Sequence, residues 1–225
     1  MRIVLTSVGY ADFLSVTLSA WKACIPAGCL TVATSPEDRA SQRLAEAHGV
    51  PFIATDAWSR MDPTCHVGPR PGFNMAFGLD VALGLAGDRL PRPLVGQVCA
   101  HVNADCYPVG QWPDVSTFAP DTVYGFWRYE CPTPDDLNAY LSGTRSQDSF
   151  PRMKNAKGGP IGYCQIFRYV PGLRFGSYPS AGGFDTDFTK RFPNRVMRDD
   201  VFLLHLGTRD KRNWAGRVLP TWGAA

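Results

Sequence analysis

Asp105, which follows an apolar run, is a residue of this chain that could do chemistry. The stretch CAHVNADCYPV (99–109) leads from apolar residues directly into Asn103 and Asp105. A carboxylate at the carboxyl end of a strand can bind a hard divalent cation that also holds phosphate oxygens. An ordinary turn aspartate is the alternative, and the triplet by itself does not separate the two.

A histidine occupies a similar place later in the chain. The apolar segment DVFLLHLG (200–207) ends in His205, followed by Leu206 and Gly207. A neutral imidazole can ligate ions such as Mn²⁺ beside carboxylates. A histidine that simply packs in the core or lies at the surface is the alternative for this residue.

The segment AGGFDTDF (181–188) places two carboxylates behind a pair of glycines. The glycines permit a tight turn or a close backbone approach, and they lead to Asp185 and Asp187. A carboxylate beside a sugar hydroxyl could act as a general base. Acidic residues at a helix N-terminus, where the helix dipole favours them, are the alternative.

The first half of the chain alternates apolar strand patterns with helical patterns. The segment 11–24 places Phe13, Leu14, Thr17, Leu18 and Trp21 on one helical face. Such alternation is typical of a parallel sheet covered on both faces, so the sequence predicts an α/β fold with a mostly parallel central sheet flanked by helices. The predicted strands are 2–7, 29–35, 50–55 and 93–102, and the predicted helices are 11–24, 35–49 and 73–87.

The helix over 35–49 is predicted to begin at Ser35 as its N-cap, with proline at the first helical position and glycine at the exit. Parallel sheets bind ligands beyond the carboxyl ends of their strands. The polar residues that end the predicted strands should therefore share one rim with Asn103 and Asp105. Candidates there for contact with a nucleotide are Thr6, Ser7, Ser35 and Asp56, with capping and turn roles as the alternative.

The second half reads differently, with strands over 122–130, 163–170 and 200–207 and helices beginning at 133 and within 179–192. No domain boundary is visible, which predicts a single domain over 1–225 with halves 1–110 and 111–225. The polar segment 145–162 is predicted to be a long loop. Its cations could form a lid over a diphosphate, or the loop could simply be solvated; they are Arg145, Arg152, Lys154 and Lys157.

The composition of the 225 residues is that of a globular protein, with 44% hydrophobic and 19% charged residues and a net charge of +3. The interrupted N-terminal run fits neither a signal peptide nor a membrane span. We therefore expect a cytoplasmic protein without membrane insertion. Seven cysteines without a CxxC pair are expected to be reduced and mostly packed.

Taken in order, these motifs resemble those of the GT-A-fold glycosyltransferases, in particular family 2 and the metal-dependent galactosyltransferases. The resemblance covers most of the chain and is carried by the whole ordered set, because each motif alone is weak. The matching segments are LTVATSPEDRASQRLAEAHGVPFIATDAW (30–58), Phe73-Asn74, NADCYP (103–108), GGFDTD (182–187), HLG (205–207) and NWAGR (213–217).

The resemblance implies a metal-dependent transfer of a sugar from a nucleotide-sugar, expected to be a UDP-sugar, to an acceptor hydroxyl. Asp105 and His205 would ligate Mn²⁺ or Mg²⁺. Asn103 stands where the family usually has an aspartate that contacts the ribose; it lacks that charge, and Asn74 belongs to the matched donor-binding segment. The cation would neutralise charge on the diphosphate leaving group.

The same resemblance places the catalytic base at Asp185, with Asp187 as the second candidate. A single displacement assisted by that base would invert the anomeric centre. A different alignment within family 2 would bring Asp199 and Asp200 into consideration instead.

Other functions also fit parts of this sequence. A nucleotidyltransferase on a similar sheet would need a glycine-rich phosphate loop, which TSVGYADF (6–13) lacks. The basic and aromatic segment TRDKRNWAGR (208–217) also resembles a nucleic-acid-binding surface without catalysis. Sugar transfer and nucleic-acid binding together would give a glycosyltransferase that modifies a hydroxymethylated pyrimidine in DNA. Such an enzyme would act in the host cytoplasm if the protein is phage-encoded. A glycan or a small molecule is the alternative acceptor.

Overall fold

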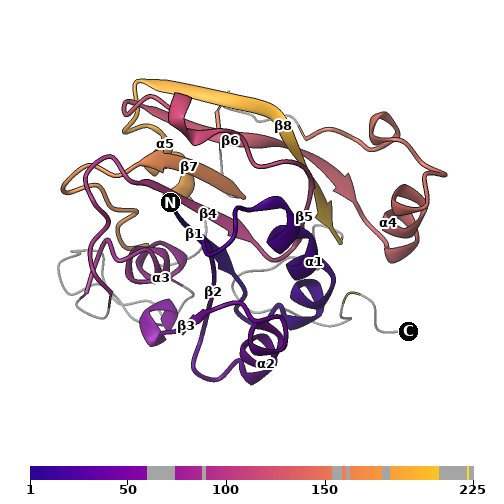
Figure 1. The fold of residues 1–225 in the computed structure, drawn as a ribbon, viewed down its shortest axis with the longest axis horizontal. Helices are drawn as coiled ribbons and strands as arrows, with labels where there is room; N and C mark the ends of the chain where they lie inside the picture. Colours follow the sequence, from indigo (N-terminus) through magenta and orange to yellow (C-terminus); the bar gives the residue numbers. More distant parts are fainter. Residues whose placement is uncertain are drawn as a thin grey trace.

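A computed structural model describes residues 1–59, 74–87, 90–153, 159–160, 163–178, 183–207 and 222. These residues form one eight-stranded sheet with the strand order β3-β2-β1-β4-β7-β6-β8-β5, flanked by helices (Figure 1). Both halves of the chain contribute strands to it. The strands are β1 (Arg2–Thr6), β2 (Leu30–Thr34), β3 (Phe52–Ala54), β4 (Val98–Asn103), β5 (Cys106–Gly110), β6 (Thr122–Cys131), β7 (Cys164–Arg168) and β8 (Asn194–Leu206).

Strands β1 to β4 are parallel to one another, in the order β3-β2-β1-β4, as the alternating pattern predicted. Thr6 at the end of β1 pairs with Ala33 of β2 and with Asn103 of β4. Thr34 at the end of β2 pairs with Ala54 of β3. The predicted rim of polar residues at the carboxyl ends of these strands is therefore confirmed.

The other half of the sheet corrects the prediction of a mostly parallel sheet. Strand β7 runs antiparallel to both β4 and β6, and β5 runs antiparallel to β8, while β6 and β8 are parallel. The pairing of β6 with β8 has an irregularity, because Phe126 pairs with Arg198 whereas Trp127 pairs with Phe202. The fold is thus α/β with a mixed sheet.

Five α-helices lie in the described part of the chain, and they cover the sheet on both faces. Alternate residues of β1 separate two cores: Ile3 and Leu5 pack in one cluster with α1 and α2, whereas Val4 packs in another with α3 and α5. This alternation is expected for a strand buried on both sides. The helices are α1 (Ala11–Cys24), α2 (Arg39–Ala47), α3 (Met75–Ala82), α4 (Pro134–Leu141) and α5 (Phe184–Thr189).

Helix α1 has the predicted bounds, and all five residues of its predicted apolar face are buried. Helix α2 corrects the prediction for its start. Its N-cap is Asp38, whose side chain accepts a hydrogen bond from the Ser41 backbone N–H, and Ser35 lies before the helix. A carboxylate satisfies the free N–H groups of a first turn as well as a serine does, so the SPED segment offered two competing caps.

The structure corrects several predicted extents: β4 begins at Val98 and not at 93, and α3 covers Met75–Ala82 and not 73–87. Strand β5 was not predicted, because Pro108 and the preceding turn residues disfavour a strand. Strand β8 begins at Asn194, six residues before its predicted start. No helix within the described residues is long and apolar enough to cross a membrane.

Candidate functional site

Asp105, Cys106 and His205 form a buried cluster in which one ligand atom from each lies within 4.8 Å of the others. Asp105 lies in the turn that follows β4, and Cys106 begins β5. The antiparallel pairing of β5 with β8 sets Cys106 opposite His205. The Nε2 atom of His205 lies 3.4 Å from Oδ2 of Asp105. The structure thus brings together the two metal ligands that the resemblance implied, Asp105 and His205, and adds a thiol.

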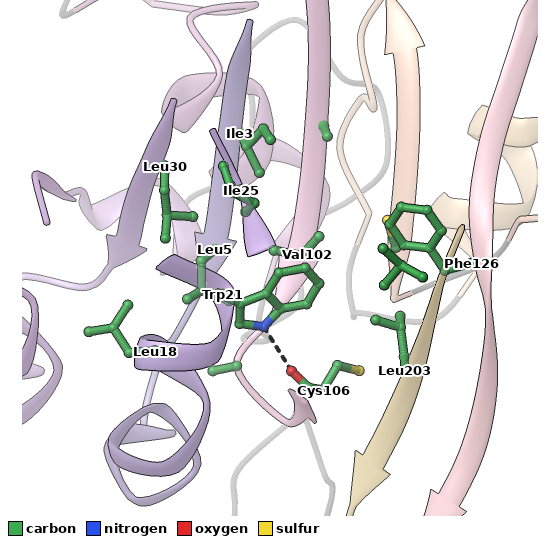
Figure 2. Close-up of a cluster of buried hydrophobic side chains, with 14 of the residues drawn as sticks. Ile3, Leu5, Leu18, Trp21, Ile25, Leu30, Val102, Cys106, Phe126 and Leu203 are labelled. Carbon is green, nitrogen blue, oxygen red and sulfur yellow. Dashed lines mark hydrogen bonds between the residues drawn. The ribbon is translucent and has the colours of Figure 1, made fainter. Parts of the chain in front are cut away.

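Three consecutive backbone carbonyls hold the turn that carries Asp105. Thr17 Oγ1 donates to the carbonyl of Ala104 at 2.8 Å. Figure 2 shows the second contact, in which Trp21 Nε1 donates to the carbonyl of Cys106 at 2.7 Å. The Leu206 N–H donates to the carbonyl of Asp105 itself, also at 2.8 Å. Thr17 and Trp21 are one turn apart on α1, so a single helix face fixes both ends of the turn.

The carboxylate of Asp105 is buried in a way that calls for a partner. Its side chain is 0% exposed, and its Oδ2 atom accepts no hydrogen bond from any described residue. Its Oδ1 atom lies 3.7 Å from the Cys106 thiol, which donates to it. A buried carboxylate oxygen without a donor is costly. A divalent cation would satisfy this oxygen, so the residues present fit such a group.

A second carboxylate contacts His205 from the other side of its ring. Oε1 of Glu130, on β6, lies 3.5 Å from Nδ1 of His205, with which it is paired across the sheet. The guanidinium of Arg128 lies 3.9 Å from the same oxygen and stacks over the Tyr163 ring at 3.4 Å. Tyr163 in turn meets the edge of the His205 ring, with centroids 4.6 Å apart.

Sequence reasoning missed Arg128, Glu130 and Tyr163. The signal present was the alternation in WRYE (127–130), which puts Arg128 and Glu130 on one face of a strand. That signal does not say which strand lies beside them, because the register of β6 with β8 follows from the irregularity at Phe126 and Trp127.

The predicted nucleotide-contacting residues at the rim divide into two groups. Thr6 and Asn103 are paired neighbours and are both buried, and Thr6 Oγ1 accepts or donates no hydrogen bond within the described chain. Ser7 is engaged with the α2 cap, because its hydroxyl lies 2.8 Å from that of Ser41, which donates to Asp38. Ser35 takes part through its backbone carbonyl, which accepts from the Gln42 side chain at 3.0 Å.

Asp56 and Asn74 occupy the starts of helical segments. Asp56 begins the short 3₁₀ helix η1 (Asp56–Ser59). Asn74 is the N-cap of α3 and is buried; its Oδ1 accepts from the backbone N–H groups of Phe77 and Tyr178, and its Nδ2 donates to Ser177 at 2.7 Å. Asn74 therefore ties α3 to the segment near Tyr178, which is a capping role.

Asp185 and Asp187 lie on the first turn of α5, which begins after Gly183 with φ +90°. Burial raises the pKa of Asp185 above its ordinary value. Hydrogen bonds from Lys190 at 2.8 Å and from the Tyr178 hydroxyl at 3.0 Å lower the pKa of Asp187. Of the two, Asp185 has the pKa direction expected for a general base near neutral pH.

The backbone of Asp185 is tied to β4 through a buried network. Gln165 Nε2 donates to the Asp185 carbonyl at 2.9 Å, and Gln165 Oε1 lies 2.9 Å from Nε2 of His101. His101 lies in β4, four residues before Asp105, which lies in the turn that follows this strand. The network therefore links the Asp185 backbone to β4, the strand that leads into the turn with Asp105.

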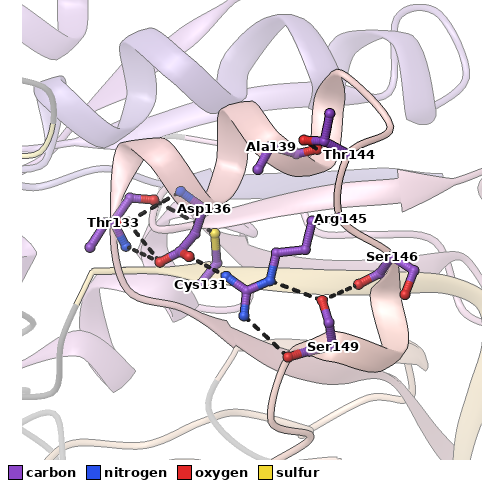
Figure 3. Close-up of polar contacts among 8 residues, drawn as sticks. All are labelled: Cys131, Thr133, Asp136, Ala139, Thr144, Arg145, Ser146 and Ser149. Carbon is purple, nitrogen blue, oxygen red and sulfur yellow. Dashed lines mark hydrogen bonds and ion pairs between the residues drawn. The ribbon is translucent and has the colours of Figure 1, made fainter.

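Arg145 of the predicted lid already has partners in this structure. Its guanidinium contacts Asp136, and its Nε donates to the Ser149 hydroxyl at 2.9 Å (Figure 3). Asp136 also completes the capping box of α4 with Thr133. Arg152 stacks over Trp127, with its guanidinium carbon 4.3 Å from the ring centroid. Lys154, Lys157, Phe73 and the 208–217 segment lie outside the described residues.

Asp199 and Asp200 lie in the irregular part of β8, where both are exposed. A hydrogen bond from Arg198 lowers the pKa of Asp200, and their Nε and Oδ2 atoms are 2.5 Å apart. A carboxylate with a lowered pKa and a bound guanidinium is a poor general base near neutral pH.

No family model matches this chain, and no curated protein matches it. Among solved structures, one described as the crystal structure of a mycobacterial protein is similar, with 16% sequence identity and a TM-score of 0.49. The match covers 97% of this chain and 68% of that chain. At that identity and TM-score, the likeness identifies neither a family nor a function.

Proposed function

We propose that the protein is a metal-dependent glycosyltransferase of the GT-A fold that uses a nucleotide-sugar donor. One observation carries the proposal: the buried Oδ2 of Asp105 faces Nε2 of His205 at 3.4 Å, at the rim where the parallel strands end. The parallel order β3-β2-β1-β4, followed by the antiparallel β7, supports the finer fold assignment.

The residues of the rim would bind and orient the donor. A bound cation would supply the positive charge that a diphosphate leaving group requires. Asp105 and His205 would hold it, and Mn²⁺ suits a carboxylate with an imidazole better than Mg²⁺, which prefers oxygen ligands alone. Thr6 and Asn103 would face the nucleotide of a UDP-sugar, since they are neighbours at the end of β1 and β4.

Asp185 would remove the proton from the attacking acceptor hydroxyl. Its raised pKa supports this role, because a base whose pKa lies closer to the working pH transfers protons more effectively. The transfer would proceed as a single displacement with inversion. The acceptor class we propose is a hydroxyl on a glycan, a small molecule or a hydroxymethylated pyrimidine in DNA, encountered in the cytoplasm.

The test combines binding with turnover. The purified chain is mixed with Mn²⁺ and a panel of UDP- and GDP-sugars, and its melting temperature and slow donor hydrolysis are measured. We expect a rise in melting temperature that needs both Mn²⁺ and one sugar nucleotide, because a ligand that binds only the folded state stabilises it.

A matched pair of variants makes the test specific. Asp105→Ala should abolish the metal-dependent rise, whereas Asp148→Ala, which removes an exposed carboxylate elsewhere, should keep it. The absence of a rise with every sugar nucleotide would count against the transferase.

A further inference from the structure

We propose that Cys106 is a third protein ligand of the cation, so that the centre selects a thiophilic divalent metal such as Zn²⁺ or Co²⁺. The inference rests on the metal centre of the proposed function, but it does not depend on which reaction that centre serves. It adds a sulfur donor to the oxygen and nitrogen of Asp105 and His205.

The separations of the donor atoms support this assignment. Two ligands that are each about 2.0–2.1 Å from a tetrahedral zinc ion lie about 3.4 Å apart, and a thiolate at about 2.3 Å lies about 3.6 Å from an oxygen ligand. The observed His205 Nε2 to Asp105 Oδ2 distance is 3.4 Å. The Cys106 sulfur lies 3.7 Å from the other carboxylate oxygen of Asp105, Oδ1, and one ligand atom from each of the three residues lies within 4.8 Å of the others.

The position of Cys106 in the fold is set by two separate constraints. Its backbone carbonyl accepts a hydrogen bond from Trp21 Nε1. The pairing of β5 with β8 places Cys106 opposite His205. The side chains of directly paired residues lie on the same face of a sheet. The sulfur therefore faces the imidazole because of the register.

The donor set decides the class of metal. Thiolate and imidazole ligands suit Zn²⁺ and Co²⁺, whereas Mg²⁺ takes oxygen ligands at octahedral geometry. Three protein ligands leave a fourth position for a phosphate oxygen, as in catalytic zinc sites. As the cation binds, the Cys106 S–H bond breaks, the sulfur–metal bond forms, and one proton passes to the buffer.

Cobalt reports sulfur ligation directly. The full-length chain, freed of metal with a chelator, is titrated with Co²⁺ in the absence of any sugar nucleotide. We expect one equivalent to produce the near-ultraviolet sulfur-to-cobalt charge-transfer absorption. Cys106→Ser should lose that absorption. Cys131→Ser should retain it, since Cys131 is also buried in this part of the sheet but its thiol contacts the Thr133 carbonyl.

A comparison between metals tests selectivity. Zn²⁺ and Co²⁺ bind more tightly than Mn²⁺ at almost any site of this type, so the ranking alone is not informative. Loss of an outer-shell partner costs 10–100-fold in affinity, so loss of a direct ligand in Cys106→Ser should weaken Co²⁺ binding by at least about tenfold. The Mn²⁺ affinity should change much less.

The outcomes separate the two proposals. Co²⁺ binding without the sulfur absorption in the unmodified chain, or no Co²⁺ binding at all, would overturn the role of Cys106. The Mn²⁺-dependent sugar-nucleotide response would still stand or fall on its own measurement. The sulfur absorption together with no response to any sugar nucleotide would support the thiolate ligand and overturn the transferase.

Discussion

The Nδ1 atom of His205 lies 3.5 Å from Oε1 of Glu130, across the imidazole ring from the Asp105 carboxylate. A carboxylate at Nδ1 favours the tautomer with its proton on that atom. The lone pair of Nε2 then points toward Asp105, where a metal ion would be shared. Histidine ligands of metals are commonly held in this way by a second carboxylate or a carbonyl.

We therefore expect Glu130→Ala to weaken binding of Mn²⁺ or Co²⁺ by about 10–100-fold, as measured by isothermal titration calorimetry. Glu130→Gln should recover part of the loss, because its amide oxygen can still accept from Nδ1–H. Glu46→Ala, which removes an exposed glutamate on α2, is the control and should change nothing. An unchanged affinity in Glu130→Ala would show that His205 is oriented by other contacts.

Asp105→Asn should separate stability from metal binding. One oxygen of the buried Asp105 carboxylate accepts no hydrogen bond from the described residues, and a buried charge that is not fully hydrogen-bonded is costly, so a neutral amide of similar shape removes this cost. In the presence of a chelator, we therefore expect the free energy of unfolding in urea to stay the same or to rise. With metal, only the unmodified chain should gain stability. A loss of several kcal/mol in chelator would instead mark Asp105 as a structural carboxylate.

Asp185→Asn should abolish sugar transfer while keeping the donor-dependent shift in melting temperature. Asp187→Asn should retain most of the activity, since Asp187 is engaged by Lys190 and Tyr178. Because burial raises the pKa of Asp185, the rate of transfer should fall with decreasing pH at a higher pH than for an ordinary aspartate. Full transfer by Asp185→Asn would refute its assignment as the base.

His101 should make the fold sensitive to acid. Burial lowers the pKa of His101 from 6.5 to about 4, so the unfolded chain binds more protons between these values. Stability is therefore complete above pH 6.5 and is lost as the pH falls toward 4, by about 3 kcal/mol. His101→Gln has no imidazole at this position and should not show this loss of stability. Between pH 7 and pH 4, the unmodified chain should therefore lose about 3 kcal/mol more of its unfolding free energy than His101→Gln loses.

Trp21→Phe should affect both the fold and the metal centre. It leaves the Cys106 carbonyl without its indole donor, at a cost of about 1–3 kcal/mol. Trp58→Phe is a matched control, because Trp58 Nε1 donates to the Thr34 carbonyl at 2.9 Å on the other face of the sheet. Both variants should lose similar stability in urea, but only Trp21→Phe should bind Co²⁺ more weakly. Equal metal affinities would mean that α1 does not position the site.

Sequence reasoning worked where one element determines the outcome. Helix α1 was predicted with its bounds and its buried face, because five apolar or small residues at helical spacing leave no other face to bury. The rim was predictable because parallel strands that follow helices end at the same edge. Asp105 and His205 could be singled out as residues at the ends of apolar strands, although the resemblance was needed to pair them.

The misses concern contacts between distant strands. Strand β5 contains Pro108, which a sheet tolerates here because β5 lies at the end of the strand order. Cys106 and Glu130 approach His205 through the registers of β5 and β6 with β8, which residue types do not reveal. Ser35 and Asp38 are both good hydrogen-bond acceptors for a helix N-terminus, and the first turn of α2 follows Asp38 and not Ser35.

Because the pairing of β6 with β8 is interrupted, the metal centre depends on the number of residues in β8 between Arg198 and Phe202 as well as on the chemistry of its ligands. An uninterrupted ladder continuing from the Phe126–Arg198 pair would have set Phe202 beside Glu130; the interruption sets His205 there. Since a slip of one residue turns every side chain to the opposite face, losing a single residue from 199–201 could dismantle the centre with every ligand still encoded. The number of residues at 199–201, none of which is a ligand, is thus itself a requirement for the metal centre.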